Sequence, residues 1–383
     1  MRILVDYRSA LRQRTGVGEY IHQLIRAYAA AYPGEVTIFT SSWKDRPSLQ
    51  VSSELGVPII DRRIPVRVLN LLWHRAEWPT IEAVAGPVDL AHSAHPLLMP
   101  ARYAAQVVTI HDLFFLTDSA RNGAEIQRDY PALAGSHARR AHAVITSTDY
   151  GKRLVRDRLG VSEERIYVCR PGAPSWKSIG QGPNIPREGY LLFVGTLEPR
   201  KNIGKLLDAY EVLLGRRPSP PTLLIAGRAT AEAREWLSRI EAPPLAGRVR
   251  YAGYVPDEQR EQLYSGARLL VLPSLDEGFG LPALEAMSAG VPVVASNRGS
   301  LPEVVGSAGV LVDPDDVAAM STALERLAFD DAAAAEAGAA GLARAQAFTW
   351  GAAAATLHRA YEEAIARRQA PSGTGHHSPM KPV

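Results

Sequence analysis

The sequence has only one cysteine among 383 residues, so a disulfide framework and a metal centre built on several cysteines are both excluded. Cys169 fits a protein of a reducing compartment, and a small buried apolar side chain is its simplest role. Residues 1–6 hold no apolar stretch of the length that a signal peptide or a membrane-spanning helix requires. From these absences we expect a cytoplasmic protein.

A strong excess of charge is also absent, since the formal net charge is +3. Residues 1–180 carry 23 Lys and Arg against 17 Asp and Glu, whereas residues 181–383 carry 20 against 23. Nucleic-acid-binding proteins concentrate positive charge more densely, so we expect no nucleic-acid partner. The weakly basic first half suits an acidic ligand or an anionic membrane surface, and ordinary surface variation explains it equally well.

Long hydrophobic runs are missing as well, and short ones alternate with segments of helical period. This alternation is typical of α/β domains, in which a parallel sheet has helices on both faces. The expected strands form two series, one at residues 3–5, 36–39, 88–91, 107–110 and 143–146 and the other at 190–194, 222–226, 249–252, 269–272 and 291–295. We therefore predict two doubly wound, Rossmann-like domains that face each other across a cleft.

The length agrees with two domains of about 180 residues, each large enough to bury its own core. A stretch rich in Gly and Pro, residues 178–186, separates the two series of strands and is typical of a linker. We place the N-terminal domain at 1–180 and the C-terminal domain at 187–347. A last helix follows at 348–369, and a disordered tail at 370–383 carries a weak metal signal, two adjacent histidines.

The most informative loop, Asp276-Glu277-Gly278-Phe279-Gly280-Leu281, follows a strand and continues into a helix. Such a loop directs backbone N–H groups and the positive end of the helix dipole at a ligand, and phosphate suits that position. Glu277 precedes the turn, and Glu285 is expected about two turns into the helix. Carboxylates in these places can accept hydrogen bonds from the hydroxyls of a sugar or a ribose. Taken alone, the loop is explained equally well as a tight structural turn.

A second motif, Gly195-Thr196-Leu197-Glu198-Pro199-Arg200-Lys201-Asn202, follows the first strand of the second half. It places Arg200 and Lys201 at the start of a helix, where cations are unfavourable, and this suggests that a bound anion compensates them. Two solvated side chains remain the simpler explanation. Val255 lies in a turn after a third strand, where backbone groups can reach a base or serve only as a turn.

Two candidates lie in the first half. Gly16 belongs to Thr15-Gly16-Val17-Gly18, which opens a helix and offers a weak phosphate or sugar contact. His111 ends a strand, beside Asp112, at the carboxyl edge where open α/β sheets bind ligands. A structural and a functional role are about equally supported for this histidine.

In combination these motifs resemble the retaining family-4 glycosyltransferases of the GT-B fold, and within them the mannosyltransferase-like branch. The resemblance covers about residues 1–368. It includes the two glutamates separated by seven residues, the Gly195–Asn202 motif and the His-Asp step. It also includes Asp6-Tyr7-Arg8 with the following Gly-Val-Gly, and Phe348-Thr349-Trp350 before the last helix, which in relatives crosses back onto the N-terminal domain.

The resemblance implies a nucleotide-sugar donor held mainly by the C-terminal domain and an acceptor held by the N-terminal domain. GDP-mannose is the leading donor, with UDP-sugars behind it, and the acceptor is a glycan or a lipid-linked sugar in cell-surface polysaccharide or glycolipid synthesis. The resemblance implies that Glu277 binds hydroxyls of the donor sugar, that Glu285 binds the ribose and that Val255 borders the base. It implies that Arg200 and Lys201 bind the diphosphate, and that the backbone at Gly278, Phe279, Gly280 and Leu281 binds the sugar and the distal phosphate. His111 and Gly16 would approach from the acceptor side. Thr196 stands where many relatives carry an arginine, so Arg200 is expected to replace that arginine.

The transfer itself leaves positive charge on the sugar and negative charge on the diphosphate, which cations and backbone donors stabilise. Without an obvious protein nucleophile, we expect front-face attack in which the leaving phosphate accepts the acceptor proton, with Glu277 as the alternative nucleophile. Two other functions stay open. A nucleotide-sugar epimerase requires further acid and base carboxylates in the cleft, and a non-catalytic sugar receptor is usually exported.

Two further stretches bear on metals and membranes. Asp313-Pro314-Asp315-Asp316 contains an Asp-x-Asp pattern, but it directly precedes a predicted helix, where capping explains it better. We therefore expect no metal. Residues 62–75 mix cations with large apolar side chains and suit peripheral contact with the inner face of the plasma membrane or a lipid-linked acceptor. Core packing with an exposed basic edge is the favoured explanation.

Overall fold

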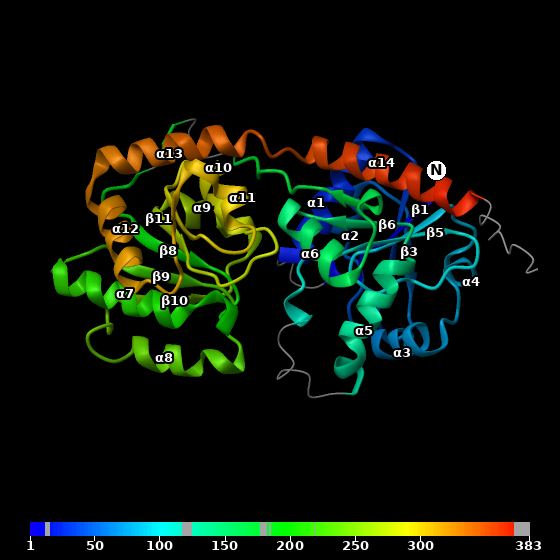
Figure 1. Cartoon of the computed structure of the whole chain (residues 1–383), viewed down its shortest axis with the longest axis horizontal. Helices are drawn as coiled ribbons and strands as arrows, with labels where there is room; N and C mark the ends of the chain where they lie inside the picture. Colours follow the sequence, from blue (N-terminus) through cyan, green and yellow to red (C-terminus); the bar gives the residue numbers. More distant parts are fainter. Residues whose placement is uncertain (12–15, 117–124, 177–181, 184, 218, 371–383) are drawn as a thin grey trace, which may run out of the picture.

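The computed structural model describes residues 1–11, 16–116, 125–176, 182–183, 185–217 and 219–370. Two lobes lie side by side, each built around a parallel sheet with helices on its faces (Figure 1). Most of the predicted linker, including residues 178–181, lies outside the described residues. So does the predicted tail at 370–383 with its two histidines, except for residue 370.

The N-terminal sheet has the strand order β3-β2-β1-β4-β5-β6-β7, and every neighbouring pair is parallel. All carboxyl ends therefore meet at one edge, as the doubly wound prediction requires. The sequence predicted five of these strands and missed the two edge strands, β3 and β7. The bounds are β1 (Ile3–Asp6), β2 (Val36–Ser41), β3 (Ile59–Arg62), β4 (Leu90–Ser93), β5 (Ala105–Thr109), β6 (Ala143–Thr146) and β7 (Ile166–Val168).

The helices of this lobe pack apolar faces against the sheet. In the basic stretch that the sequence singled out, Leu69 and Trp73 are fully buried while the cationic edge is exposed, which confirms core packing. The bounds are α1 (Gly16–Ala31), α2 (Leu49–Leu55), α3 (Val66–Ala76), α4 (Ile81–Ala85), α5 (Glu125–Arg140) and α6 (Asp149–Leu159).

The C-terminal sheet has the order β10-β9-β8-β11-β12-β13 and is also parallel throughout. Its strands are β8 (Tyr190–Val194), β9 (Leu223–Ala226), β10 (Val249–Gly253), β11 (Ala267–Leu272), β12 (Val293–Ser296) and β13 (Val310–Val312), and β13 was missed from the sequence. Its helices are α7 (Ile203–Arg216), α8 (Arg234–Ile240), α9 (Asp257–Ser265), α10 (Leu281–Ser288), α11 (Leu301–Val305), α12 (Val317–Phe329) and α13 (Asp331–Ala345).

The last helix, α14 (Trp350–Gln369), leaves the C-terminal lobe and lies across the N-terminal lobe, as predicted (Figure 1). Its apolar face joins the N-terminal core, and the hydroxyl of Tyr361 lies 2.6 Å from Nδ1 of the buried His92. The chain passes between the lobes twice, once after β7 and once before α14. These two segments are hydrogen-bonded to each other, because the Ala173 N–H donates to the Phe348 carbonyl at 2.9 Å. The C-terminal helix is therefore part of the N-terminal domain's core.

Buried histidines make the stability of this fold sensitive to acid. Burial lowers the pKa of His92 to about 3 and that of His111 to about 4, against about 6.5 for an exposed histidine. Between pH 6.5 and 4 the unfolded chain therefore binds more protons than the folded chain. The free energy of unfolding must fall as the pH falls through this window.

We expect urea unfolding at pH 7, 6 and 5 to show a stability loss of up to about 1.4 kcal/mol per pH unit for each such histidine. A His92→Gln variant is expected to be less stable at pH 7, but its stability should fall less steeply with acid. A wild-type stability that stayed constant between pH 7 and 5 would contradict this account.

Candidate active site

A cavity of about 410 Å³ lies between the lobes and is lined by both of them. Its walls include every residue that the sequence singled out, namely Gly16, His111, Arg200, Lys201, Val255, Glu277, Gly278, Phe279, Gly280, Leu281 and Glu285. These residues come from the carboxyl edges of the two sheets, where loops from separate strands converge. Sequence positions more than 260 residues apart therefore meet in one site.

The loop after β11 has its shape because of glycine. Gly280 has a left-handed backbone (φ +93°), and a Cβ there would lie 2.6 Å from the Leu301 side chain. Helix α10 begins at the next residue, so Glu285 lies about one turn into the helix and not two, as the sequence suggested. Gly280, Leu281 and Pro282, at the start of α10, line the cavity.

The Glu277 carboxylate is buried, and both of its oxygens have partners within the protein. Its Oε1 accepts hydrogen bonds from the Ser274 hydroxyl at 2.7 Å and from Lys201 Nζ, and its Oε2 lies 3.3 Å from Arg200 Nη1. Burial alone would raise the pKa of Glu277, but the charges of Lys201 and Arg200 outweigh burial and hold it below its usual value. Glu277 is therefore an anion that cannot serve as a proton donor at neutral pH.

The two cations are compensated within the protein. Arg200 and Lys201 lie in a 3₁₀ turn before α7, and Arg200 Nη2 lies 2.7 Å from Glu198 Oε1. With Glu277 as the second carboxylate, two anions balance two cations. The sequence suggested compensation by a bound anion, with two solvated side chains as the alternative, and in the structure Glu198 and Glu277 pair with both cations. Anion binding by Arg200 and Lys201 stays a prediction.

Glu285 is held by two side chains that the sequence reasoning missed. Arg260 Nη1 donates to Glu285 Oε1 at 2.9 Å, and the Tyr264 hydroxyl donates to Oε2 at 2.6 Å. Arg260 and Tyr264 lie four residues apart on α9 and so face the same side. This spacing was visible in the sequence, but nothing there linked α9 to the glutamate.

The N-terminal wall is formed by the start of α1 and by residues that follow strands β5, β6 and β7. His111 Nε2 donates to the Ala94 carbonyl at 3.1 Å, so Nδ1 carries the lone pair of a neutral imidazole. The ring packs edge-on against Tyr20, with centroids 5.3 Å apart. Tyr20 and Ser147 also line the cavity, and the sequence analysis had not selected either.

The lobes touch at the loop after β11, residues 276–281, which we call the glycine loop. A Cβ on Gly278 would lie only 2.0 Å from the His111 carbonyl oxygen, so no larger residue fits without a shift of the backbone. The hydroxyls of Ser147 and Thr148 both donate to the Gly278 carbonyl at 3.1 Å. The glycine loop is thereby held against residues that follow two strands of the N-terminal lobe, β5 and β6.

The Asp-x-Asp stretch is occupied by structural contacts. Asp313 and Asp315 accept bonds from Arg298 Nη2 at 2.8 and 2.7 Å, and the Asp316 side chain caps α12. Within the part of the chain that the structure describes, no group of three or more His, Cys, Asp or Glu is arranged to hold a metal ion.

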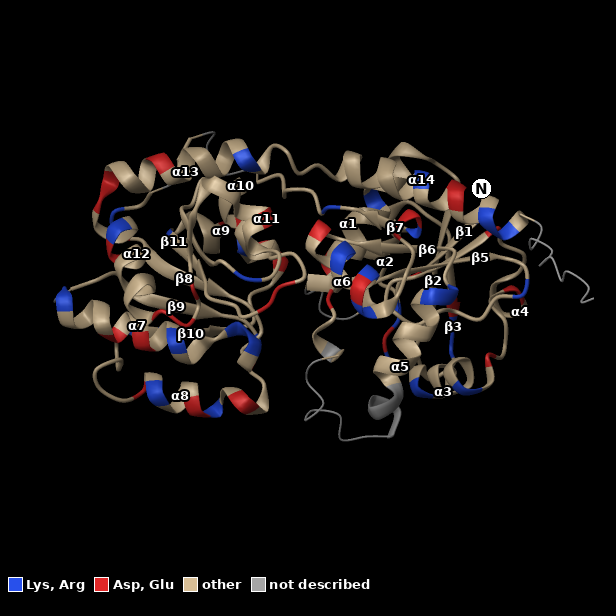
Figure 2. Ribbon diagram, in the orientation of Figure 1, with Lys and Arg blue, Asp and Glu red and all other residues tan. Residues whose placement is uncertain are grey.

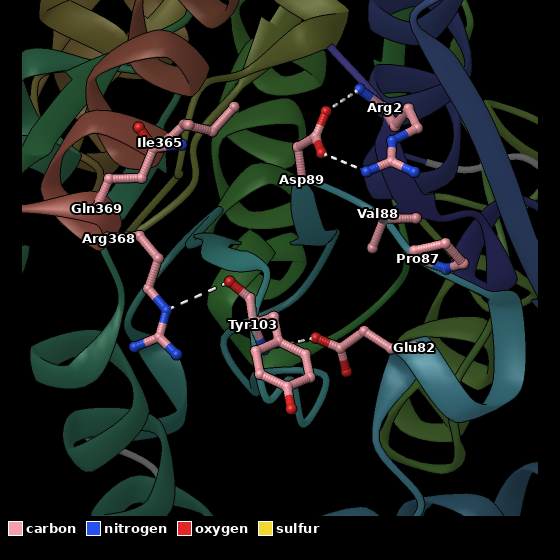
Figure 3. A pocket seen from close by; sticks show the side chains of 9 residues that line it. All are labelled: Arg2, Glu82, Pro87, Val88, Asp89, Tyr103, Ile365, Arg368 and Gln369. Carbon is pink, nitrogen blue, oxygen red and sulfur yellow. Dashed lines mark hydrogen bonds and ion pairs between the residues drawn. The ribbon is translucent and has the colours of Figure 1, made fainter.

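A second hollow of about 410 Å³ lies at the opposite, amino edge of the N-terminal sheet (Figure 3). Its charged groups all have partners within the protein. Arg2 Nη2 lies 2.9 Å from Asp89 Oδ1, Arg368 Nε donates to the Tyr103 carbonyl at 3.3 Å, and Glu82 accepts from the Tyr103 N–H at 2.8 Å. It contains none of the candidate residues, so the cavity between the lobes is the stronger site.

Comparisons with known proteins match both halves of the chain. Residues 14–174 match the family described as Glycosyltransferase Family 4, and residues 188–330 match Glycosyl transferases group 1. The chain is 33% identical to the O-antigen chain mannosyltransferase B of Escherichia coli, over 88% of this chain and 93% of that protein. It is 32% identical to the serotype-specific mannosyltransferase WbdA of Escherichia coli, over 72% of this chain and 33% of that longer protein.

Solved structures share the fold across almost the whole chain. Sucrose-phosphate synthase from Thermosynechococcus elongatus superposes with a TM-score of 0.74 at 23% identity, covering 96% of this chain and 100% of that chain. HepE from Anabaena in complex with UDP-glucose superposes with a TM-score of 0.70 at 19% identity, with the same coverage. The expected arrangement of two Rossmann-like domains is confirmed.

The contact at Gly278 can be tested by substitution. We expect Gly278→Ala to push the loop away from His111 and to lower the turnover number by about 100-fold, because displacements of about 1 Å cost that much in positioned reactions. Gly215→Ala is the control, since a Cβ at that position meets nothing within 4 Å. Wild-type turnover in a folded Gly278→Ala enzyme would show that the contact is dispensable.

Proposed function

Because the chain belongs to the glycosyltransferases of group 1 and family 4, we propose that it transfers mannose from GDP-mannose to a glycan or lipid-linked acceptor, with retention of anomeric configuration. The two relatives above are mannosyltransferases by name, and this favours mannose. The observation that carries the proposal is the cavity in which Glu277, Glu285, Lys201 and His111 converge from both lobes. A UDP-sugar donor is the alternative.

The C-terminal wall has the chemistry of a nucleotide-sugar site. Glu285, held in place by Arg260 and Tyr264, offers carboxylate oxygens to ribose hydroxyls. The backbone at Val255 lies on the same wall and can border the base. The N–H groups of Phe279, Gly280 and Leu281 suit the sugar and the distal phosphate, at the positive end of α10.

Lys201 and Arg200 are assigned to the diphosphate. When the anomeric C–O bond breaks, negative charge grows on the leaving group, and nearby cations that are already held in position stabilise it without reorganisation. The carboxylates of Glu198 and Glu277 hold these cations in position before a donor binds. We assign to Arg200 the diphosphate contact of the arginine that many relatives carry at the Thr196 position.

Front-face attack is the mechanism that the geometry favours. The Glu277 carboxylate already accepts bonds from Ser274, Lys201 and Arg200, and such engagement weakens it as a nucleophile. It is better suited to accept bonds from donor-sugar hydroxyls. The departing phosphate then accepts the acceptor's hydroxyl proton, while neutral His111 supplies a hydrogen-bonding group from the N-terminal lobe. No metal is assigned to this reaction.

Thermal unfolding with candidate donors tests the donor assignment. GDP-mannose at about 100 times its dissociation constant should stabilise the fold by about 2.7 kcal/mol, and so raise the melting temperature by several degrees. UDP-glucose and UDP-N-acetylglucosamine should raise it less. Glu285→Gln should abolish the shift, and Glu325→Gln on α12 should preserve it. A larger shift with a UDP-sugar would overturn GDP-mannose as the donor.

We also propose peripheral contact of the N-terminal lobe with an anionic membrane, which would bring a lipid-linked acceptor to the site. On α3, Val68 and Leu71 are about half exposed. The cations Arg63, Arg67 and Arg75 lie on the same exposed segment, and Figure 2 shows this basic stretch at the margin of the lobe. Apolar side chains flanked by cations favour the surface of an anionic bilayer. Among the described helices, none is long and apolar enough to cross a membrane.

Co-sedimentation with phosphatidylcholine vesicles containing phosphatidylglycerol tests this contact. Arg67→Glu should weaken binding by about tenfold or more, since each cation near an anionic surface contributes about 1 kcal/mol. Arg326→Glu makes the same charge change at an exposed position on α12 and should have little effect. Equal losses in both variants would indicate general charge attraction and refute a specific surface on α3.

A further inference from the structure

The N-terminus of α6 is capped partly by the other lobe. The backbone N–H groups of Asp149 and Tyr150 donate to the two carboxylate oxygens of Glu303, each at 3.0 Å. The next N–H group, that of Gly151, donates to the Thr148 hydroxyl at 3.0 Å. Glu303 lies on α11 in the C-terminal lobe, so one acidic side chain satisfies two helix donors across the domain boundary.

Charge supports the same contact. A carboxylate is favoured at the positive end of a helix dipole, and α6 has eleven residues to supply that dipole. Arg170 Nη2 lies 3.2 Å from Glu303 Oε1 and also pairs with Asp149. The Glu303 carboxylate is therefore bound by backbone donors and by a cation, all from the N-terminal lobe.

The same elements hold the loop at the candidate active site. The turn that precedes α6 donates two hydroxyl hydrogen bonds to the Gly278 carbonyl. On the other side, the Ser300 N–H, three residues before Glu303, donates to the Glu277 carbonyl at 3.2 Å. Two neighbouring carbonyls of the glycine loop are thus bound, that of Gly278 by the β6–α6 turn and that of Glu277 by the start of α11, and Glu303 joins these two elements.

We propose that Glu303 is a positioning residue that couples closure of the two lobes to the placement of the glycine loop against His111. Rotation of the lobes apart would break the Glu303 contacts and the Gly278 contacts together, and would withdraw His111 from the donor. Glu303 does not line the cavity, so it acts through the loop and not on the substrate. Only the expected loss of turnover rests on the proposed transfer reaction, whereas the effect on the position of the lobes does not.

The test combines small-angle X-ray scattering, nucleotide binding and kinetics on the full chain. Glu303→Ala should increase the radius of gyration without ligand and should lower the turnover number by about tenfold or more. The dissociation constants of GDP and UDP, measured by calorimetry, should change by less than about twofold, because the proposed nucleotide contacts lie within the C-terminal lobe. Glu303→Gln retains one acceptor oxygen, so the loss of turnover in this variant should be smaller than in Glu303→Ala.

Glu325→Ala on α12 is the matched control, because its carboxylate pairs with Arg216 and Arg217 within one lobe. Wild-type scattering and turnover in Glu303→Ala would overturn the proposal. Loss of nucleotide binding in parallel with turnover would also overturn it, since Glu303 would then support the donor site or the fold itself. The scattering result does not depend on which sugar is transferred, so a wrong donor assignment leaves this test intact.

Discussion

A glycine backbone pressed against a carbonyl oxygen governs how the two lobes meet. Because Gly278 has no side chain, its backbone approaches the His111 carbonyl more closely than any other residue would allow. The hydroxyls of Ser147 and Thr148 can then reach the Gly278 carbonyl, and the carboxyl edges of the two sheets enclose one cavity. The position of His111 relative to this loop follows from the same approach.

Charge balance is the second feature on which the site depends. Lys201 and Arg200 face Glu277 and Glu198 in a largely buried network, so these four groups together contribute little net charge to the site. Their arrangement is ordered before a ligand binds, which limits the reorganisation that binding requires. It also explains how an anionic donor can be assigned to the lobe whose overall charge is negative, since local geometry and not net charge decides where phosphate is bound.

The sequence allowed the central strands and the site loops to be located, because apolar runs mark buried parallel strands and the motifs follow their carboxyl ends. It did not reveal β3, β7 or β13, which are edge strands of only three or four residues and too short to show a clear pattern. The start of α10 was misplaced because Gly280 sets it through a left-handed turn. Pairings such as Arg260 with Glu285 depend on how separate elements are brought together, and no local pattern encodes them.

The return of α14 to the N-terminal lobe has a consequence for synthesis of the chain. Ala353, Leu357 and Tyr361 belong to the N-terminal core, yet they follow the entire C-terminal lobe in the sequence. On the ribosome the first lobe emerges with the surface that receives α14 still uncovered, and the second lobe can complete its sheet before that surface is filled. The first domain to be translated is thus the last to be finished, and its apolar face depends on protection from aggregation until the final helix arrives.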